Sequence, residues 1–214
     1  TTRAIKRRER AQRLFRGPPT SVRIYGSTMR VIGGKYKGRQ LAKVRGDVRP
    51  TMDRMREKLF SVIDSSIEGS VWLDLFAGSG AVGIEAASRG ASFVLFNDRE
   101  RIGIKLIETN IDRVGFDIPH MILKKDAFSL IRRPCTEFLE GPATHVYLDP
   151  PFDFGRYPKL LNKLADSGWI DSASLVILEL FKKTSPDVVP DVYRIKRELE
   201  GGDSRLLMLE LAPD

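Results

Sequence analysis

The chain has 214 residues, of which 42% are hydrophobic and 30% are charged. These values fit one globular domain, or one domain with an appendage, and the apolar runs are far shorter than the roughly 20 residues of a membrane-spanning helix. One cysteine and two histidines exclude an internal disulfide and argue against a structural metal, so we expect a reducing compartment.

Positive charge is concentrated near the N-terminus. The formal net charge is +8, but residues 1–58 contain 18 of the 36 Lys and Arg and only 4 of the 28 Asp and Glu, so they carry +14 and the rest of the chain carries −6. A basic segment on an acidic body is typical of a protein that binds nucleic-acid phosphates. A solvated tail has the same composition, so charge alone leaves both interpretations open.

Residues 1–28 are rich in arginine and contain one acid, Glu9. We expect a basic N-terminal extension here. An organellar targeting peptide is the alternative, because such peptides are also rich in arginine and poor in acids. No stretch resembles the apolar core of a secretion signal, so the expected location is the cytoplasm.

The pattern becomes regular from Met29 onward. Residues 29–33 and 39–44 flank a glycine-containing turn, which predicts a short hairpin. Apolar residues then recur at helical spacing over 51–63, with Thr51 as the expected N-cap. We predict a hairpin and helix over residues 29–66 that face RNA, followed by a larger domain over residues 67–214.

The larger domain alternates between short apolar runs and amphipathic segments. Strands are expected at 71–76, 92–98, 120–126, 145–151 and 174–180, with helices at 81–90, 102–115 and 157–168. Two last runs, 192–199 and 206–211, are expected to be antiparallel strands. This alternation predicts an α/β fold with a doubly wound, mostly parallel sheet, whose ligands bind beyond the carboxyl ends of the strands.

A glycine loop follows the first of these strands. Gly78, Gly80 and Gly83 have the GxGxxG spacing, and Asp98 lies 20 residues after the first glycine. Dinucleotide sites share both features, so the loop alone is ambiguous. Asp74, at the end of the strand, would repel a pyrophosphate and favours a cationic ligand such as S-adenosylmethionine.

The fourth strand of the larger domain ends in Asp149-Pro150-Pro151-Phe152. Proline lacks an N–H group and holds the preceding residue extended, so this corner presents hydrogen-bond acceptors. The Asp149 carboxylate and the Pro150 carbonyl would accept the two N–H groups of an exocyclic amine, and Phe152 would stack on the base. Taken alone, the motif also fits a strand-terminating turn with Phe152 in the core.

Together, DLFAGSG, Asp98, Asp126 and DPPF resemble the class I S-adenosylmethionine-dependent methyltransferases that act on exocyclic amines. The segment MRVIGGKYKGRQL, followed by RPTMDRMREKLF, resembles the RsmD-type 16S rRNA (guanine-N2)-methyltransferases. The resemblance runs from Met29 to about Leu211. It implies a seven-stranded Rossmann-like sheet with an antiparallel last strand, S-adenosylmethionine as cofactor, and a monomer that acts on 16S rRNA in the small ribosomal subunit or an assembly intermediate.

The resemblance also assigns site residues by position. The implied catalytic loop is Asp149, Pro150, Pro151 and Phe152. The implied cofactor contacts are Asp74, Phe76, Ala77, Gly78, Gly80, Asp98, Asp126 and Ala127, with Glu100 as the alternative to Asp98. The implied RNA contacts are Arg30, Lys35, Lys37, Arg39, Arg49, Thr51 and Arg56. No metal ligand is expected.

Three other functions share part of these features. An N6-adenine DNA methyltransferase would use the same diproline corner, a nicotinamide-dependent oxidoreductase would share GxGxxG, and a non-catalytic RNA-binding protein would explain the charge. We expect Cys135, His120 and His145 to have no catalytic or metal-binding role, and Trp72 and Trp169 to pack in the core.

Overall fold

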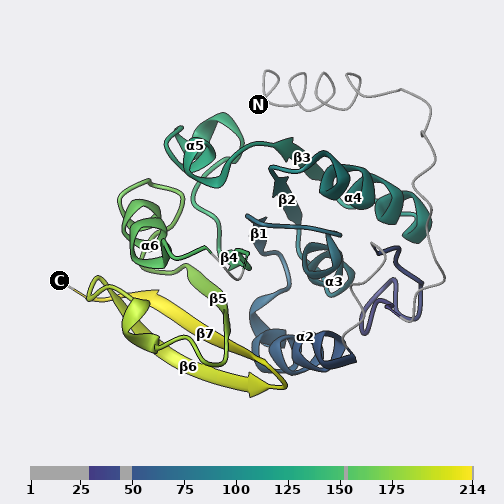
Figure 1. Cartoon of the computed structure of the whole chain (residues 1–214). Helices are drawn as coiled ribbons and strands as arrows, with labels where there is room; N and C mark the ends of the chain where they lie inside the picture. Colours follow the sequence, from purple (N-terminus) through teal and green to yellow (C-terminus); the bar gives the residue numbers. More distant parts are fainter. Residues whose placement is uncertain (1–28, 44–49, 152–153, 214) are drawn as a thin grey trace.

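A computed structural model describes residues 29–43, 50–151 and 154–213. Its centre is one seven-stranded sheet with the strand order β3-β2-β1-β4-β5-β7-β6 (Figure 1). The strands are β1 (Val71–Asp74), β2 (Phe93–Asp98), β3 (His120–Lys124), β4 (His145–Leu148), β5 (Leu175–Phe181), β6 (Tyr193–Gly201) and β7 (Ser204–Leu211). Strands β1 to β5 pair in parallel, whereas β7 is antiparallel to both β5 and β6. The predicted sheet, with its antiparallel last strand, is confirmed.

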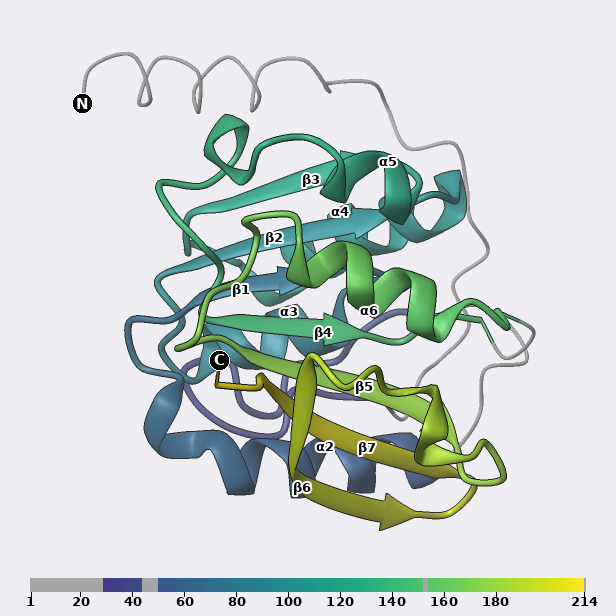
Figure 2. The same ribbon diagram turned by 90° about the vertical axis from the view of Figure 1, so that its left-hand side faces the viewer.

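Helices cover both faces of this sheet. One face carries α2 (Pro50–Ile63), α3 (Ala81–Ser88) and α4 (Arg101–Val114), and the other carries α5 (Ala127–Ile131) and α6 (Tyr157–Ala165), as Figures 1 and 2 show. Short 3-10 turns lie at η1 (Asp64–Ser66), η2 (Cys135–Glu137) and η3 (Pro186–Val188). Among the described residues, no helix is both long enough and apolar enough to cross a membrane.

The core consists of two hydrophobic clusters, one on each face of the sheet. Successive strand residues point to opposite faces, so Trp72 belongs to the cluster under α3, and its neighbour Leu73 belongs to the cluster under α6. Because both faces are covered, the central strands are continuous apolar runs. Trp72 and Trp169 are fully buried, as predicted.

Residues 29–43 form a hairpin-like loop with one antiparallel bridge, between Arg30 and Gln40. Backbone hydrogen bonds cross the loop on either side of this bridge, from the Val31 N–H to the Arg39 carbonyl oxygen and from the Leu41 N–H to the Met29 carbonyl oxygen. This loop docks on α3 through Glu85, which is fully buried. The Glu85 carboxylate accepts the backbone N–H of Ile32 at 2.7 Å and of Gly33 at 2.8 Å. The predicted hairpin is therefore present as a turn with one bridge, without regular strands.

Helix α2 begins at Pro50, so Thr51 lies inside its first turn and is not the N-cap. The fixed φ of proline suits the first helical position, which explains the earlier start. Met55 and Leu59 of α2 belong to the same hydrophobic cluster as Trp72 in the sheet. The hydrophobic core is therefore continuous across residue 66, and the division of the chain at this residue stays a prediction.

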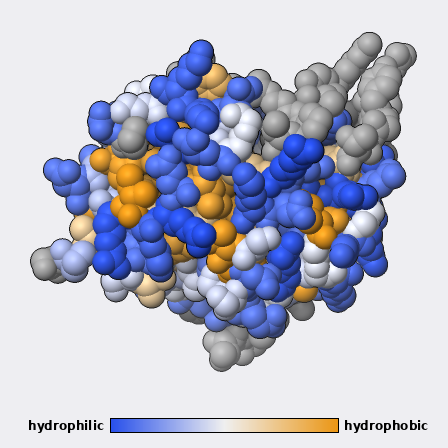
Figure 3. Space-filling view, turned by 90° about the horizontal axis from the view of Figure 1, so that it is seen from below, coloured by the Kyte–Doolittle hydropathy of each residue, from blue (hydrophilic) through white to orange (hydrophobic). Residues whose placement is uncertain are grey.

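Figure 3 views the molecule from the side on which α2 and β6 lie in Figure 1. Hydrophobic surface on this face is broken into small patches separated by hydrophilic residues. The edge strand β6 carries two cations that pair with one carboxylate of β7: Arg194 Nη2 lies 2.8 Å from Glu210 Oε2, and Lys196 Nζ lies 2.5 Å from Glu210 Oε1. Small separated patches are ordinary protein surface.

Candidate active site

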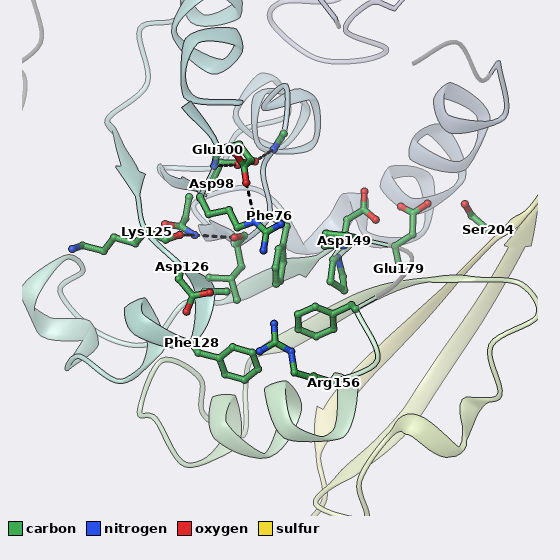
Figure 4. A pocket seen from close by; sticks show the side chains of 18 residues that line it. Phe76, Asp98, Glu100, Lys125, Asp126, Phe128, Asp149, Arg156, Glu179 and Ser204 are labelled. Carbon is green, nitrogen blue, oxygen red and sulfur yellow. Dashed lines mark hydrogen bonds and ion pairs between the residues drawn. The ribbon is translucent and has the colours of Figure 1, made fainter. Parts of the chain in front are cut away.

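A cavity of about 430 Å³ opens beyond the carboxyl ends of the parallel strands (Figure 4). This volume is typical of a small-molecule or cofactor site. Most of the lining comes from the end of β2 and from the segments that follow β1, β2, β3 and β4, while one residue each comes from β5 and β7. The lining residues are Leu75, Phe76, Gly78, Asn97, Asp98, Arg99, Glu100, Lys125, Asp126, Ala127, Phe128, Asp149, Pro150, Pro151, Phe154, Arg156, Glu179 and Ser204. The cavity thus contains both the glycine loop and the diproline corner, which are about 70 residues apart in the chain.

The glycine loop has the backbone geometry that only glycine adopts readily. Gly78 and Gly80 have φ values of +53° and +76°, in the left-handed region that side chains disfavour. The Gly78 N–H donates to Asp98 Oδ2 at 2.8 Å. A bare stretch of backbone at Gly78 therefore forms part of the cavity wall.

Asp98 is fixed by two backbone groups at the end of β2. Besides the Gly78 N–H, it accepts the Glu100 N–H at Oδ1 over 2.7 Å. Glu100 instead pairs with Arg99 at 3.0 Å, and its side chain is 63% exposed. Both carboxylates line the cavity, but only Asp98 is held in place by the backbone, which favours Asp98 over Glu100 as a ligand for ribose hydroxyls.

Asp74 lies beneath the glycine loop and does not line the cavity. It is 1% exposed, and its Oδ2 accepts the N–H of Gly83 in the first turn of α3 at 3.1 Å. Burial raises the pKa of Asp74 to about 7, and the nearby charge of Asp98 adds to the rise. In this structure the carboxylate supports the helix N-terminus, and contact of Asp74 with a cofactor stays a prediction. Ala77 and Gly80 likewise do not line the cavity.

Asp126 and Ala127 both line the cavity, and Figure 4 shows Asp126 across it from Asp149. Asp126 is the N-cap of α5, where its Oδ1 accepts the Ser129 N–H at 3.0 Å. A capping carboxylate keeps free lone pairs, so it remains available to a ligand.

Asn97 is a cavity residue that sequence reasoning missed. Its Nδ2 donates to the carbonyl oxygens of Leu75 at 3.0 Å and Lys125 at 3.1 Å, which ties the loops after β1 and β3 together. The residue is 1% exposed, and its Oδ1 has no hydrogen-bond partner among the described residues. Nothing in the sequence distinguishes this asparagine from a solvated strand end.

The diproline corner supplies three cavity residues, Asp149, Pro150 and Pro151, whereas Phe152 lies outside the described residues. Phe154, two residues further along the chain, does line the cavity, as do Phe76 and Phe128. It stacks against Phe128 with ring centroids 6.1 Å apart, and the Arg156 guanidinium lies 5.1 Å from Phe154 and 5.0 Å from Phe128. Phe128, Phe154 and Arg156 were not expected as site residues.

Residues 29–210 match the sequence model of a protein family that is described as Conserved hypothetical protein 95. The chain is 31% identical over 175 residues to the putative rRNA methyltransferase YlbH of Bacillus subtilis, covering 81% of this chain and 94% of that protein. It is also 31% identical over 175 residues to ribosomal RNA small subunit methyltransferase D of Escherichia coli K12, covering 81% and 85%. The chain belongs to this family, the RsmD type.

A solved structure described as the putative methyltransferase yhhF from Escherichia coli has the same fold. It superposes with a TM-score of 0.72 at 29% identity, covering 87% of this chain and 99% of that one. The resemblance inferred from the motifs is thus confirmed, and the protein is a methyltransferase of the RsmD type.

Four predicted RNA-binding residues of this RsmD-type chain are exposed on the hairpin: Arg30, Lys35, Lys37 and Arg39. Lys35 Nζ pairs with Asp117 Oδ2 at 2.5 Å, and the Arg39 guanidinium donates to the carbonyl oxygen of Val114. These two cations bind the hairpin to the end of α4 and its following loop. Contact of the four residues with RNA stays a prediction.

Arg56 requires a correction, because it is buried. It is 6% exposed, its Nη2 donates to the carbonyl oxygen of Arg30 at 2.6 Å, and its Nε lies 4.0 Å from Glu85 Oε2. Burial lowers its pKa, while the charges of Asp53 and Glu85 oppose the shift. Arg56 holds the hairpin to α2 and does not face RNA. Arg49 and the side chain of Thr51 lie outside the described residues.

The histidines and the cysteine stand away from the cavity. His145 is buried in β4, where its ring stacks on Trp72 with centroids 5.0 Å apart. Cys135 is buried in η2, and the His120 Nδ1 hydrogen-bonds the carbonyl oxygen of Ile118. In the part of the chain that the structure describes, no three His, Cys, Asp or Glu side chains are grouped to hold a metal.

Proposed function

We propose that this protein transfers a methyl group from S-adenosylmethionine to the exocyclic N2 amine of one guanine in 16S rRNA. One observation carries the proposal: the acceptor corner of Asp149 and Pro150 lines the same cavity as the glycine loop and Asp98. A nucleobase amine and a nucleoside cofactor therefore have adjacent places in one cavity. The relatives named as rRNA methyltransferases support RNA as the substrate.

The cavity residues fit S-adenosylmethionine, the cofactor of this family. The bare backbone at Gly78 leaves room for close approach, the carboxylate of Asp98 suits two ribose hydroxyls, and the unpaired Oδ1 of Asn97 is an acceptor without a partner in the described chain. Asp126 and Ala127 would contact the adenine edge, and Phe76 would pack against the cofactor. When bound, the cofactor supplies an electrophilic methyl group on a positively charged sulfur.

The protein's contribution to the chemistry is mainly positioning. Asp149 and the Pro150 carbonyl would accept the two N–H groups of the guanine amine and hold its nitrogen in line with the methyl carbon. Such positioning is worth up to about 7–11 kcal/mol. The Asp149 carboxylate also stabilises positive charge that develops on the amine. A neutral arylamine is too weak an acid for Asp149 to deprotonate it first, so the proton leaves after methyl transfer.

The substrate must present the guanine outside a stacked helix. Extruding a base costs a few kcal/mol and costs least for a loop nucleotide. In this proposal the basic N-terminal segment binds the surrounding rRNA phosphates, in the small subunit or an assembly intermediate. We further propose that the protein acts as a monomer in the cytoplasm.

The alternative functions are separable from this one. Membership of a methyltransferase family argues against a nicotinamide-dependent oxidoreductase and a non-catalytic RNA-binding protein. An N6-adenine DNA methyltransferase would use the same diproline corner, and the nucleoside that becomes methylated distinguishes the two.

The test is Asp149→Ala, assayed with small subunits lacking the modification. We expect methyl transfer to fall by at least about 1,000-fold, because both amine orientation and charge stabilisation are lost, while S-adenosylmethionine affinity measured by calorimetry stays near that of the wild type. The control is Asp191→Ala, an exposed carboxylate away from the cavity. Near-wild-type methylation by Asp149→Ala would disprove the role of the corner, and mass spectrometry identifies the modified nucleoside.

A further inference from the structure

A second carboxylate stands beside Asp149 in the cavity, and the function proposed above does not use it. Strands β4 and β5 pair in parallel with Leu148 opposite Leu178, so the next residues along these strands, Asp149 and Glu179, are neighbours at the edge of the sheet. Both line the cavity. Figure 4 shows the two side chains next to each other, with Ser204 beyond them.

Glu179 is held in place by a buried tyrosine. The Tyr147 hydroxyl, from β4, donates to Glu179 Oε2. Burial and the charges of Glu179 and Asp149 raise the pKa of Tyr147 well above its usual value, so the hydroxyl stays protonated and keeps donating. Tyr147 is only 5% exposed, which makes it a rigid support for the carboxylate.

One hydrogen bond leaves most of the acceptor capacity of Glu179 unused. A carboxylate has about four acceptor positions, and Tyr147 occupies one. Within residues 29–43, 50–151 and 154–213, Glu179 forms no ion pair with a lysine or arginine. A fixed carboxylate without a cationic partner, at a cavity wall, is suited to accept a hydrogen bond from a ligand.

Guanine offers a donor at the matching place. Its Watson–Crick edge has the N1–H directly beside the N2 amine, whereas adenine has a lone pair at N1 beside its N6 amine. If Asp149 and Pro150 accept the amine, the neighbouring carboxylate faces N1. A guanine then donates a hydrogen bond from N1–H to an ionised acceptor, and such bonds are strong. With an adenine, the lone pair at N1 would face a lone pair of the carboxylate, and the two would repel each other.

We propose that Glu179 accepts the N1–H of the target guanine and thereby makes the site selective for guanine over purines that lack this donor. This inference rests on the proposed guanine-N2 activity. Sites built to hydrogen-bond a substrate N–H can reject an analogue without it by about 10⁴- to 10⁵-fold. Tyr147 is the residue that positions Glu179.

The test uses a purine that keeps the 2-amino group but has a lone pair at N1. Small subunits are reconstituted with 16S rRNA that carries either guanine or 2,6-diaminopurine at the position that the wild-type enzyme methylates, and kcat/KM is measured for each. We expect the wild type to prefer guanine by at least about 100-fold. Glu179→Gln should reduce this preference by at least about tenfold, because the amide can donate to N1 and the charged hydrogen bond is lost.

Two further variants show whether a change in the preference for guanine comes from Glu179 itself. Glu198→Gln changes a carboxylate of β6 that does not line the cavity, and it should keep the wild-type preference. Tyr147→Phe leaves both carboxylates in place but releases Glu179, and it should weaken the preference by about threefold or more. This variant tests the idea independently of how well Glu179→Gln folds.

The outcomes separate the two proposals. A preference for guanine that is unchanged in both Glu179→Gln and Tyr147→Phe would overturn the role of Glu179 while leaving the guanine-N2 activity intact. Absence of N2-methylguanosine from guanine-containing subunits that lack the modification and are then treated with the wild-type enzyme would instead overturn the proposed function itself.

Discussion

His145 makes the stability of the core depend on pH. Its ring is 3% exposed, stacks on Trp72, and hydrogen-bonds the hydroxyls of Ser66 and Thr144 at 3.0 Å each. Burial lowers its pKa from 6.5 to about 4. The unfolded chain therefore binds this proton more tightly than the folded chain, and the free energy of unfolding falls as the pH drops from 6.5 towards 4. The whole shift corresponds to about 3 kcal/mol.

The perturbation is His145→Gln, which removes the titrating ring and keeps an amide that can bond the Ser66 hydroxyl. Between about pH 7.5 and about pH 4.5, we expect the wild type to lose about 2.5 kcal/mol more unfolding free energy than the variant. Every other titrating group cancels in this difference. Urea denaturation, followed by the fluorescence of the buried Trp72 and Trp169, measures it at both pH values.

The reasoning would be refuted by equal losses in the two proteins, which would mean that His145 binds its proton equally well in the folded and unfolded states. A greater loss in the variant would mean that the folded core holds the ring in its charged form. Loss of the ring stack lowers the stability of His145→Gln at both pH values alike, so it does not affect the comparison.

Two more predictions concern stability. Burial raises the pKa of Asp74 from 3.8 to about 7, so the folded chain binds this proton more tightly than the unfolded chain. As the pH is lowered from about 7.5 to about 4.5, the free energy of unfolding of the wild type should therefore rise by about 3 kcal/mol relative to that of Asp74→Asn. This change has the opposite sign to the one expected for His145. The same urea titrations measure this change. The prediction is contradicted if the unfolding free energy of the wild type minus that of Asp74→Asn does not increase at low pH. A Cβ at Gly83 would lie 2.4 Å from Phe96 Cε1 and 2.9 Å from Val94 Cγ1, so Gly83→Ala should destabilise the protein by about 1–3 kcal/mol. Gly141→Ala meets nothing within 4 Å and should change the melting temperature little; equal melting temperatures for the two variants would disprove the close packing of α3 on β2.

Much of the fold was predictable because its signals are local. Alternating apolar runs and amphipathic segments predicted the strands and main helices to within a few residues. The glycine loop was equally visible, since Gly78 and Gly80 adopt backbone angles that other residues avoid. Short elements such as α5 were missed, because five residues span too little of the helical period.

The roles of single polar residues were less predictable. The family resemblance implied that Arg56 contacts RNA, and Asp74 looked like a ligand at a strand end, yet both are buried and bonded within the fold. Whether such a side chain reaches solvent depends on what packs over it. For Arg56 that includes the hairpin and Glu85, and neither is near it in sequence.

The sequence by itself determined the α/β class, the cofactor loop, the diproline corner and the family, because each depends on residues that are adjacent or regularly spaced along the chain. Only the tertiary structure decided that Glu179, Phe154, Arg156 and Asn97 share the cavity with Asp149. The physical reason is that parallel strand pairing brings the carboxyl ends of distant segments to one edge of the sheet, where the register sets which side chains become neighbours.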